Sequence, residues 1–261
     1  MAELMLLFAF LASAAAGIYD LKTTEVPEEI PALMVSFGLF YWFVSALTFG
    51  DFYPLAVSIS VGTLLLALGI LAYKKGQWGG ADAWILASIA YMVPLFGNEI
   101  FMANFLSNFL IVGALYTVIY ATGLGLLRPG VFSYFIKDIR ANAKFFILPV
   151  FFLIASLFTY AFQGIDAFLR LSIIFLLLVA FWRYGKIIES RVFRKRISSS
   201  ALKEGDVVEG MIWRGITKPE INEIRKKKKY VVIKEGVRFV PAFPLTLLVT
   251  VAFGNLLFVF M

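Results

Sequence analysis

The run LMLLFAFLASAAAGIYD at Leu4–Asp20 is typical of a membrane helix and ends in an acidic residue. A second acid, Asp82, follows Gly79-Gly80-Ala81 and opens the apolar run Ala83–Phe96. Acidic side chains in or beside membrane helices are energetically expensive and are candidates for function by default. Two of them, each at one end of an apolar run, predict a shared carboxylate site.

Composition extends the membrane interpretation to the whole chain. Of its 261 residues, 61% are hydrophobic and only 16% are charged, whereas an average soluble domain is roughly 25% charged. Its apolar runs are long enough to cross a hydrocarbon core about 30 Å thick. We therefore expect an all-α polytopic membrane protein, because helices satisfy their own backbone groups in lipid. Eight spans are predicted, at about 3–20, 31–50, 53–73, 82–97, 104–127, 144–162, 166–184 and 239–260.

The chain contains neither cysteine nor histidine. The absence of cysteine excludes disulfides, Cys-ligated zinc and thiol nucleophiles. The absence of histidine removes the usual general base and the usual metal ligand. Any catalysis must therefore rest on carboxylates, hydroxyls, Lys, Arg or Tyr, and we expect no metal and no cofactor.

The distribution of basic residues predicts how the spans are oriented. If Asp20 faces the cytoplasm, 23 of the 24 Lys and Arg residues lie on the cytoplasmic side. The exception is Arg170, four residues into the seventh span, whose long side chain can reach the opposite interface. This asymmetry follows the positive-inside rule and predicts that Asp20 and Asp82 share the cytoplasmic face of a plasma membrane. The other side carries Glu3, Asp51, Glu99 and Asp166.

One extended hydrophilic segment, 185–238, interrupts the spans. It predicts three parts: a transmembrane catalytic domain at 1–184, a basic cytoplasmic α+β lobe at 185–238 and a last membrane helix at 239–261. Basic segments next to a membrane more often face anionic lipid headgroups than nucleic acid, and no aromatic-interleaved motif accompanies these basic runs. Membrane lipid is therefore an expected partner, and nucleic acid is not.

Local patterns predict the elements of this lobe. Thr217 is placed to cap a helix whose first turn holds Pro219, with Glu220 positioned to close a capping box. Alternating apolar residues and Gly-rich turns predict short strands. The expected strands are Leu202–Gly210, Tyr230–Ile233 and Val237–Val240.

Each acid of the expected site also has a simpler interpretation. Asp20 could be an ordinary interfacial residue that ends a span, and Asp82 could be the N-cap of the helix that follows it. A plain cap, however, needs no pair of glycines. Gly79 and Gly80 allow the backbone to approach closely or to adopt conformations closed to other residues, which favours a functional site at Asp82.

Gly79-Gly80-Ala81-Asp82 resembles the GxGD motif of the membrane aspartyl proteases, with Ala81 where the second Gly usually stands. Asp20–Pro27 (DLKTTEVP) resembles the stretch around the first catalytic Asp of type IV prepilin peptidases, in which Pro follows about seven residues later. Val240–Pro244 (VPAFP), before the last span, also looks like the archaeal branch of that family, the preflagellin (prearchaellin) and prepilin peptidases. That branch lacks the zinc-binding cysteines of many bacterial relatives. The sixth and seventh spans depart from the family's usual helix count.

The resemblance implies an aspartic endopeptidase in which Asp20 and Asp82 are the catalytic pair. It also implies substrates among pilin-like or archaellin precursors, whose short basic leader is removed where it meets a hydrophobic helix. Our hypothesis is that the two carboxylates share one proton, so that one activates water while the other protonates the scissile carbonyl.

The loop after Asp20 is the expected contact for a basic leader. Glu25, Glu28 and Glu29 form a local acidic patch on a face that is otherwise basic, and such a patch attracts cations. Simple solvation of a loop explains the same residues. These three glutamates, together with Gly79 and Gly80, are our candidates for substrate binding.

Two alternatives remain open at the level of sequence. Tyr19-Asp20 and Pro241-Ala242-Phe243 also resemble motifs of the presenilin-like intramembrane proteases, although Lys22 and the glutamates beyond it predict a site at the membrane boundary. A transporter in which the acids handle ions is the second alternative. Transporters often contain internal repeats and broken helices near the bilayer midplane, and we find no convincing repeat and no acid at that depth.

Overall fold

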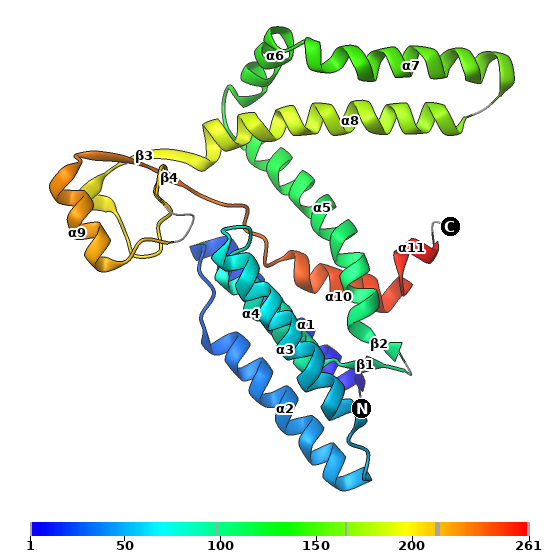
Figure 1. Ribbon diagram of the computed structural model, residues 1–261, viewed down its shortest axis with the longest axis vertical. Coiled ribbons are helices and arrows are strands. Elements are labelled where there is room, and N and C mark those ends of the chain that lie inside the picture. The colour runs from blue at the N-terminus through cyan, green and yellow to red at the C-terminus, as the bar shows by residue number, and fades with distance from the viewer. Residues whose placement is uncertain (1, 98, 165, 212–214, 260–261) are drawn as a thin grey trace. The chain divides into compact units, whose positions relative to one another are not determined.

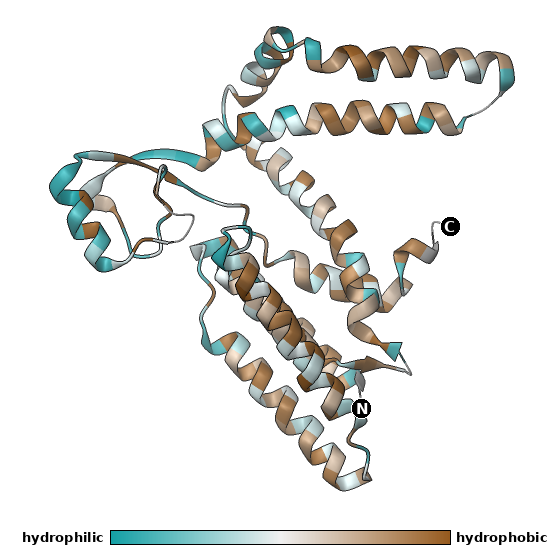
Figure 2. Ribbon diagram, in the orientation of Figure 1, coloured by the Kyte–Doolittle hydropathy of each residue, from teal (hydrophilic) through white to brown (hydrophobic). Residues whose placement is uncertain are grey.

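The computed structural model describes residues 2–97, 99–164, 166–211 and 215–259. It is 76% helical, and six of its helices are long and apolar enough to cross a membrane. These six are α1 (Ala2–Thr23), α2 (Glu29–Phe49), α3 (Tyr53–Lys74), α5 (Phe101–Leu127), α7 (Lys144–Gln163) and α8 (Ala167–Ile188) (Figure 1). Brown, hydrophobic residues run along all six (Figure 2). The expected all-α polytopic membrane protein is confirmed.

The exact count of eight spans is not confirmed. The helices in the fourth and eighth expected spans are shorter, namely α4 (Gly80–Met92) and α10 (Ala242–Phe253), which is followed by α11 (Leu256–Val259). Helix α4 ends where Pro94 follows, and the hairpin of β1 (Leu95–Phe96) and β2 (Glu99–Ile100) takes over. Helix α10 ends at Gly254, whose φ of 66° is left-handed and breaks the helix.

The chain divides into two compact units. The first contains residues 1–117 and 237–261, and the second contains 118–211 and 215–236. In the first unit, α4 lies against α1, α2 and α3, and nine of its thirteen residues are buried. Because its neighbours cover it, this short helix does not need the length of a helix that faces lipid.

Glycines on α3 allow α4 to approach closely. A Cβ built on Gly69 would lie 2.7 Å from the Cβ of Ala83, and one built on Gly62 would lie 2.7 Å from the ring of Tyr91. Real Cβ atoms do not approach other atoms so closely. Small residues let membrane helices pack closely, and here they bring α3 against the turn of α4 that carries Asp82.

The second unit contains a helix that the sequence did not predict. Helix α6 (Val131–Ala141) occupies what was expected to be a polar link, and it packs on α8, with Val131 and Ile188 buried in one apolar cluster. It was missed because its apolar residues lie on one face only, so no continuous apolar run marks it. The expected break between the sixth and seventh spans is confirmed, since α7 ends at Gln163 and α8 begins at Ala167.

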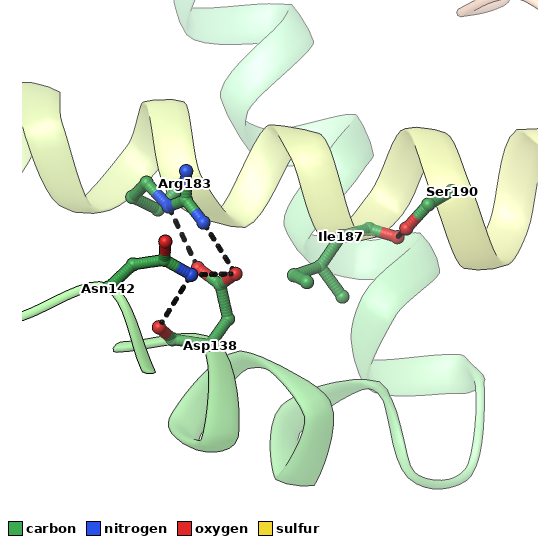
Figure 3. A network of polar contacts seen from close by, with 5 residues as sticks. All are labelled: Asp138, Asn142, Arg183, Ile187 and Ser190. Carbon is green, nitrogen blue, oxygen red and sulfur yellow. Dashed lines mark hydrogen bonds and ion pairs between the residues drawn. The ribbon is translucent and has the colours of Figure 1, made fainter. Parts of the chain in front are cut away.

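An ion pair joins α6 to α8 (Figure 3). The Nε of Arg183 donates to Asp138 Oδ2 at 2.8 Å, and its Nη2 donates to Oδ1 at 2.5 Å. The side-chain amide of Asn142 also donates to Asp138. Arg183 and Asp138 expose only 8% and 15% of their side chains. The fork geometry and the additional hydrogen bond provide the partners that buried charges require.

The small sheet of the second unit pairs β3 (Arg194–Ser198) with β4 (Tyr230–Lys234) in antiparallel register, Ser198 opposite Tyr230. Helix α9 (Lys218–Lys227) begins as predicted, with the Glu220 carboxylate accepting hydrogen bonds from the N–H and the hydroxyl of Thr217. Ile221, Ile224, Val231 and Ile233 are buried between α9 and the sheet. A π-helical turn (Glu189–Phe193) and a 3₁₀ turn (Ser199–Ala201) complete the elements of this region.

Two of the three expected strands are wrong. Leu202–Gly210 forms turns and a single β-bridge, between Val208 and Ile233. Val237–Val240 is not a strand, because its backbone groups bond to side chains of the first unit rather than to a neighbouring strand: Tyr116 donates to the carbonyl of Arg238, and the N–H of Val240 donates to Asp20. The expected strand at Tyr230–Ile233 is confirmed as β4.

The buried pair predicts a large difference between two arginines of α8. Replacing Arg183 by Met leaves the buried Asp138 carboxylate without its charged partner. We therefore expect the free energy of unfolding to fall by about 3–5 kcal/mol. Arg170→Met is the matched control, because Arg170 pairs with Asp166 on the same helix but both side chains are more than half exposed. Such a pair contributes about 0.2–1 kcal/mol. Thermal unfolding in detergent measures both; equal losses would contradict the structural role given to Arg183.

Candidate active site

Asp20 lies in the last turns of α1, which continues to Thr23. Its side chain is buried, with the residue only 8% exposed. Asp20 Oδ2 accepts a hydrogen bond from the backbone N–H of Val240 at 3.1 Å. An ordinary interfacial residue that ends a span would be exposed, so the simpler interpretation of Asp20 is wrong.

Asp82 lies in the first turn of α4 and is not its N-cap. Gly79 is the N-cap, and Asp82 is the third residue of the helix. Asp82 Oδ2 accepts a hydrogen bond from the backbone N–H of Gly79 at 3.1 Å. The carboxylate therefore bonds back to the cap, as the acidic residue of a capping box does, and the negative charge lies at the positive end of the helix dipole.

The fold brings the two acids together. Helices α1 and α4 pack on one another, and Asp20 is close enough to act electrostatically on Asp82. Ala16 on α1, Ala81 on α4 and Val240 belong to one apolar cluster. Two carboxylates that interact in an apolar environment do not both ionise without cost.

The two glycines before Asp82 differ in what they contribute. A Cβ on Gly79 would lie 2.9 Å from Asp82 Oδ2, so a side chain there would press on the carboxylate. A Cβ on Gly80 would meet only the ring of Tyr73, at an ordinary 3.7 Å. Of the two alternatives expected for the glycine pair, Gly79 fits the close approach. Neither glycine adopts a conformation closed to other residues, because Gly79 has φ −72° and ψ 153° and the φ of Gly80 is not positive.

A third segment, Arg238–Pro241, lies just before α10 and contacts Asp20. We call this segment the strap. Besides the bond from Val240, the Arg238 guanidinium donates to the carbonyl of Leu21, and Tyr116 donates to the carbonyl of Arg238 at 2.6 Å. Gly17 lies one turn before Asp20, and a Cβ there would lie 3.1 Å from the Cα of Pro241. The motif at Val240–Pro244 did not by itself predict these contacts.

Aromatic rings fix the strap to the rest of the first unit. The ring of Phe109 on α5 lies 5.5 Å from that of Phe239 and 4.7 Å from that of Phe243, and Trp78 stacks edge-on against Phe109 at 6.2 Å. Edge-to-face and offset aromatic pairs add to the energy of burial. No sequence pattern predicted these contacts, since the rings come from three separate segments.

The three glutamates of the expected leader contact lie beyond the pair. Glu25, Glu28 and Glu29 are exposed and follow α1 directly, and α1 ends because Thr24 is left-handed, with φ 65°. None of the three forms an ion pair with another described residue, so their charge is available to a cation. Within the described ranges, no group of three or more Asp or Glu side chains is placed to hold a metal ion.

The contact between Gly17 and Pro241 predicts an unusual response to alanine. Alanine normally stabilises a helix relative to glycine, by about 1 kcal/mol. We expect Gly17→Ala instead to lower the thermal unfolding midpoint, because the added methyl group presses on the strap. Gly185→Ala on α8 is the control, since a Cβ there meets nothing within 4 Å. If both variants were equally stable, the close approach of the strap would be refuted.

Comparison with known proteins gave one match. Residues 5–127 match the family model described as the type IV leader peptidase family, and this segment includes both Asp20 and Asp82. No curated protein and no solved structure matched the chain. The family match indicates a protease and supports leader-peptide processing of the prepilin type, within a multi-pass membrane protein.

Proposed function

We propose that this protein is a membrane aspartic endopeptidase that removes the short basic leader from type IV pilin-like or archaellin precursors. The observation that carries the proposal is that Asp20 of α1 acts electrostatically on Asp82 of α4, inside the segment that matches the type IV leader peptidase family. The absence of Cys and His from the sequence leaves carboxylates as the acid–base groups of choice.

In the proposed reaction the pair holds one proton. The ionised carboxylate takes a proton from water as the water oxygen attacks the scissile carbonyl carbon. The protonated carboxyl donates its proton to the carbonyl oxygen, and a tetrahedral diol forms. As the diol collapses, the protonated carboxyl donates its proton to the leaving nitrogen and the ionised carboxylate takes a proton from a diol hydroxyl, so that the C–N bond breaks and the carboxylic acid product forms. No covalent intermediate forms, and the pair ends with one proton, as it began.

The hydrogen bonds of the two acids suit this reaction. Each carboxylate has one oxygen, Oδ2, fixed by a backbone N–H, from Val240 for Asp20 and from Gly79 for Asp82. Among the described residues, neither Oδ1 accepts a hydrogen bond from the protein, so one oxygen of each carboxylate is available to water or substrate. A carboxylate held by a single backbone hydrogen bond keeps its orientation, and its other oxygen is not occupied by a salt bridge.

The proposed site lies at the cytoplasmic face of the plasma membrane, with the 185–238 lobe on the same side. The charge asymmetry of the sequence supports this orientation. A precursor helix inserted in the bilayer presents its basic leader at that face. The exposed acids Glu25, Glu28 and Glu29 would attract the leader, while Gly79 and Gly80 would line its path beside Asp82.

The first test replaces each acid by its amide. Asp20→Asn and Asp82→Asn should each reduce cleavage of a pilin-like precursor by at least about 100-fold, since each removes an acid–base group. Gel shift of the precursor in membranes measures the rate, and mass spectrometry locates the cut. Asp51→Asn is the matched control, because the exposed Asp51 only accepts a hydrogen bond from the N–H of Tyr53.

Full activity in either amide variant would refute the carboxylate pair. A cut inside the apolar segment of the precursor, rather than where the leader meets it, would favour the presenilin-like alternative. Expression and the thermal unfolding midpoint are measured for both variants. If both are unchanged, a loss of cleavage is due to the missing carboxylate and not to misfolding.

The second test concerns the acidic patch. The triple variant Glu25→Lys, Glu28→Lys, Glu29→Lys should raise the KM for a precursor with a basic leader and leave kcat nearly unchanged, because the patch contributes attraction and not chemistry. A precursor whose leader lysines are replaced by glutamine is the control. Its KM should not respond to the triple variant. If wild-type and variant enzyme had the same KM for both precursors, the glutamates would not bind the leader and would serve only to keep the loop hydrated.

A further inference from the structure

The positive charge of the chain is concentrated in one segment. Residues 185–238 contain 15 Lys and Arg against seven Asp and Glu, a net charge of +8, while the whole chain carries +7. The remainder of the protein is therefore close to neutral. A concentration of this kind indicates an anionic partner for the segment.

The paired strands present part of this charge on one face. Side chains alternate across a strand, so Ile197, Val231 and Ile233 point toward the apolar cluster beneath α9, while Arg194, Arg196 and Tyr230 point the other way. The guanidinium of Arg196 lies over the ring of Tyr230, 5.0 Å from its centre. We call the exposed surface formed by Arg194, Arg196, Lys228, Lys229 and Tyr230 the basic face.

Five acids in the described part of the lobe form ion pairs, two of them with Arg194 of the basic face. Glu209 lies between Arg194 and Lys234, and the other pairs are Glu189–Arg194, Glu235–Lys195, Glu204–Lys218 and Glu223–Lys227. Among the residues that the structure describes, Arg196, Lys228 and Lys229 have no carboxylate partner. These three residues therefore leave unpaired positive charge on the basic face.

The basic face is also hollowed. A cavity of about 240 Å³ opens beside Arg196, Lys228 and Tyr230, with Val232 and Glu209 also in its lining. The two cations of this hollow outnumber its one carboxylate, and with the ring of Tyr230 and the side chain of Val232 they suit a group that is anionic at one end and apolar at the other. A phospholipid headgroup with its glycerol has this character.

The chain holds the basic face near the bilayer. The helical segment Ala167–Phe193, which has the length and hydropathy of a membrane span, ends immediately before β3. Arg196 is three residues beyond that end, which an extended chain covers in about 10 Å. This distance is close to the Debye length of about 8–10 Å at moderate salt, within which anionic membrane surfaces attract Lys and Arg. A nucleic acid would need more stacking aromatics than the single Tyr230.

We propose that the basic face binds the headgroups of anionic phospholipids, with Arg196 and Lys228 contacting the phosphate. The lobe then lies on the membrane surface instead of extending into solvent. This inference does not depend on peptidase activity, and its test does not measure that activity.

The test compares the full-length protein in nanodiscs of phosphatidylcholine with the same protein in nanodiscs that also contain phosphatidylglycerol. Hydrogen–deuterium exchange of peptides covering 194–198 and 226–232 reports contact. We expect slower exchange in the anionic nanodiscs and loss of that protection at high salt. The double variant Arg196→Glu, Lys228→Glu should lose the protection, and Arg196→Gln, Lys228→Gln should lose part of it.

The matched control is Lys218→Glu, Lys227→Glu, which changes the charge equally but replaces lysines that pair with Glu204 and Glu223. It should retain the lipid-dependent protection. Equal exchange in both lipids for the wild type would overturn the proposal without any variant. Equal loss of the lipid-dependent protection in both charge-reversed variants would indicate diffuse attraction by the whole lobe and would overturn the assignment to the basic face. Protection in phosphatidylcholine nanodiscs by glycerol phosphate or by a short RNA would assign the face to another ligand.

Discussion

The hydrogen bond from the backbone N–H of Val240 to the carboxylate of Asp20 joins residues 220 positions apart and fixes one half of the acidic pair. A buried carboxylate is costly without a hydrogen-bond donor, and a backbone N–H is a donor with no freedom of its own. Its position is set by Gly17 against Pro241, by Tyr116 on the carbonyl of Arg238 and by the ring of Phe109. The orientation of Asp20 therefore depends on the correct packing of the C-terminal helix.

The other half of the pair depends on a short, covered helix. Helix α4 has thirteen residues, nine of them buried, and α3 approaches it at the contact of Gly69 with Ala83. Asp82 is the residue before Ala83, so the closest helix contact in this region directly adjoins the acid. A carboxylate on a rigid, enclosed helix loses little entropy when it binds a reactant, which suits the role proposed for it.

Polar groups elsewhere in the apolar helices follow the same requirement for partners. Asn108, fully buried on α5, donates to Thr250 and to the carbonyl of Gly254 and accepts from the N–H of Leu256. It thereby satisfies the backbone groups left free where α10 ends and α11 begins. Ser156 and Ser172 bond to one another at 2.6 Å between α7 and α8. Each polar side chain has a specific partner, because lipid offers no water as a substitute.

The sequence by itself determined the class of fold and the choice of candidate acids. Uninterrupted apolar length predicts membrane helices because the cost of placing polar backbone in lipid is local, and six of the eight predicted spans are long apolar helices. The acids stood out for the same local reason, and the motif around each carried the resemblance that the family match supports. The start of α9 was predicted correctly because a capping box is contained within four residues.

Only the tertiary structure decided what depends on contacts between distant segments. The strap on Asp20, the Arg183–Asp138 pair and the rings around Phe109 join residues that no short pattern connects. Helix α6 was missed because its apolar residues lie on one face and form no uninterrupted apolar run. The ends of α4 and α10 were misjudged because composition records how apolar a segment is and not how its neighbours cover it. Which acid bonds to which N–H is a property of packing, and packing is determined by the whole chain.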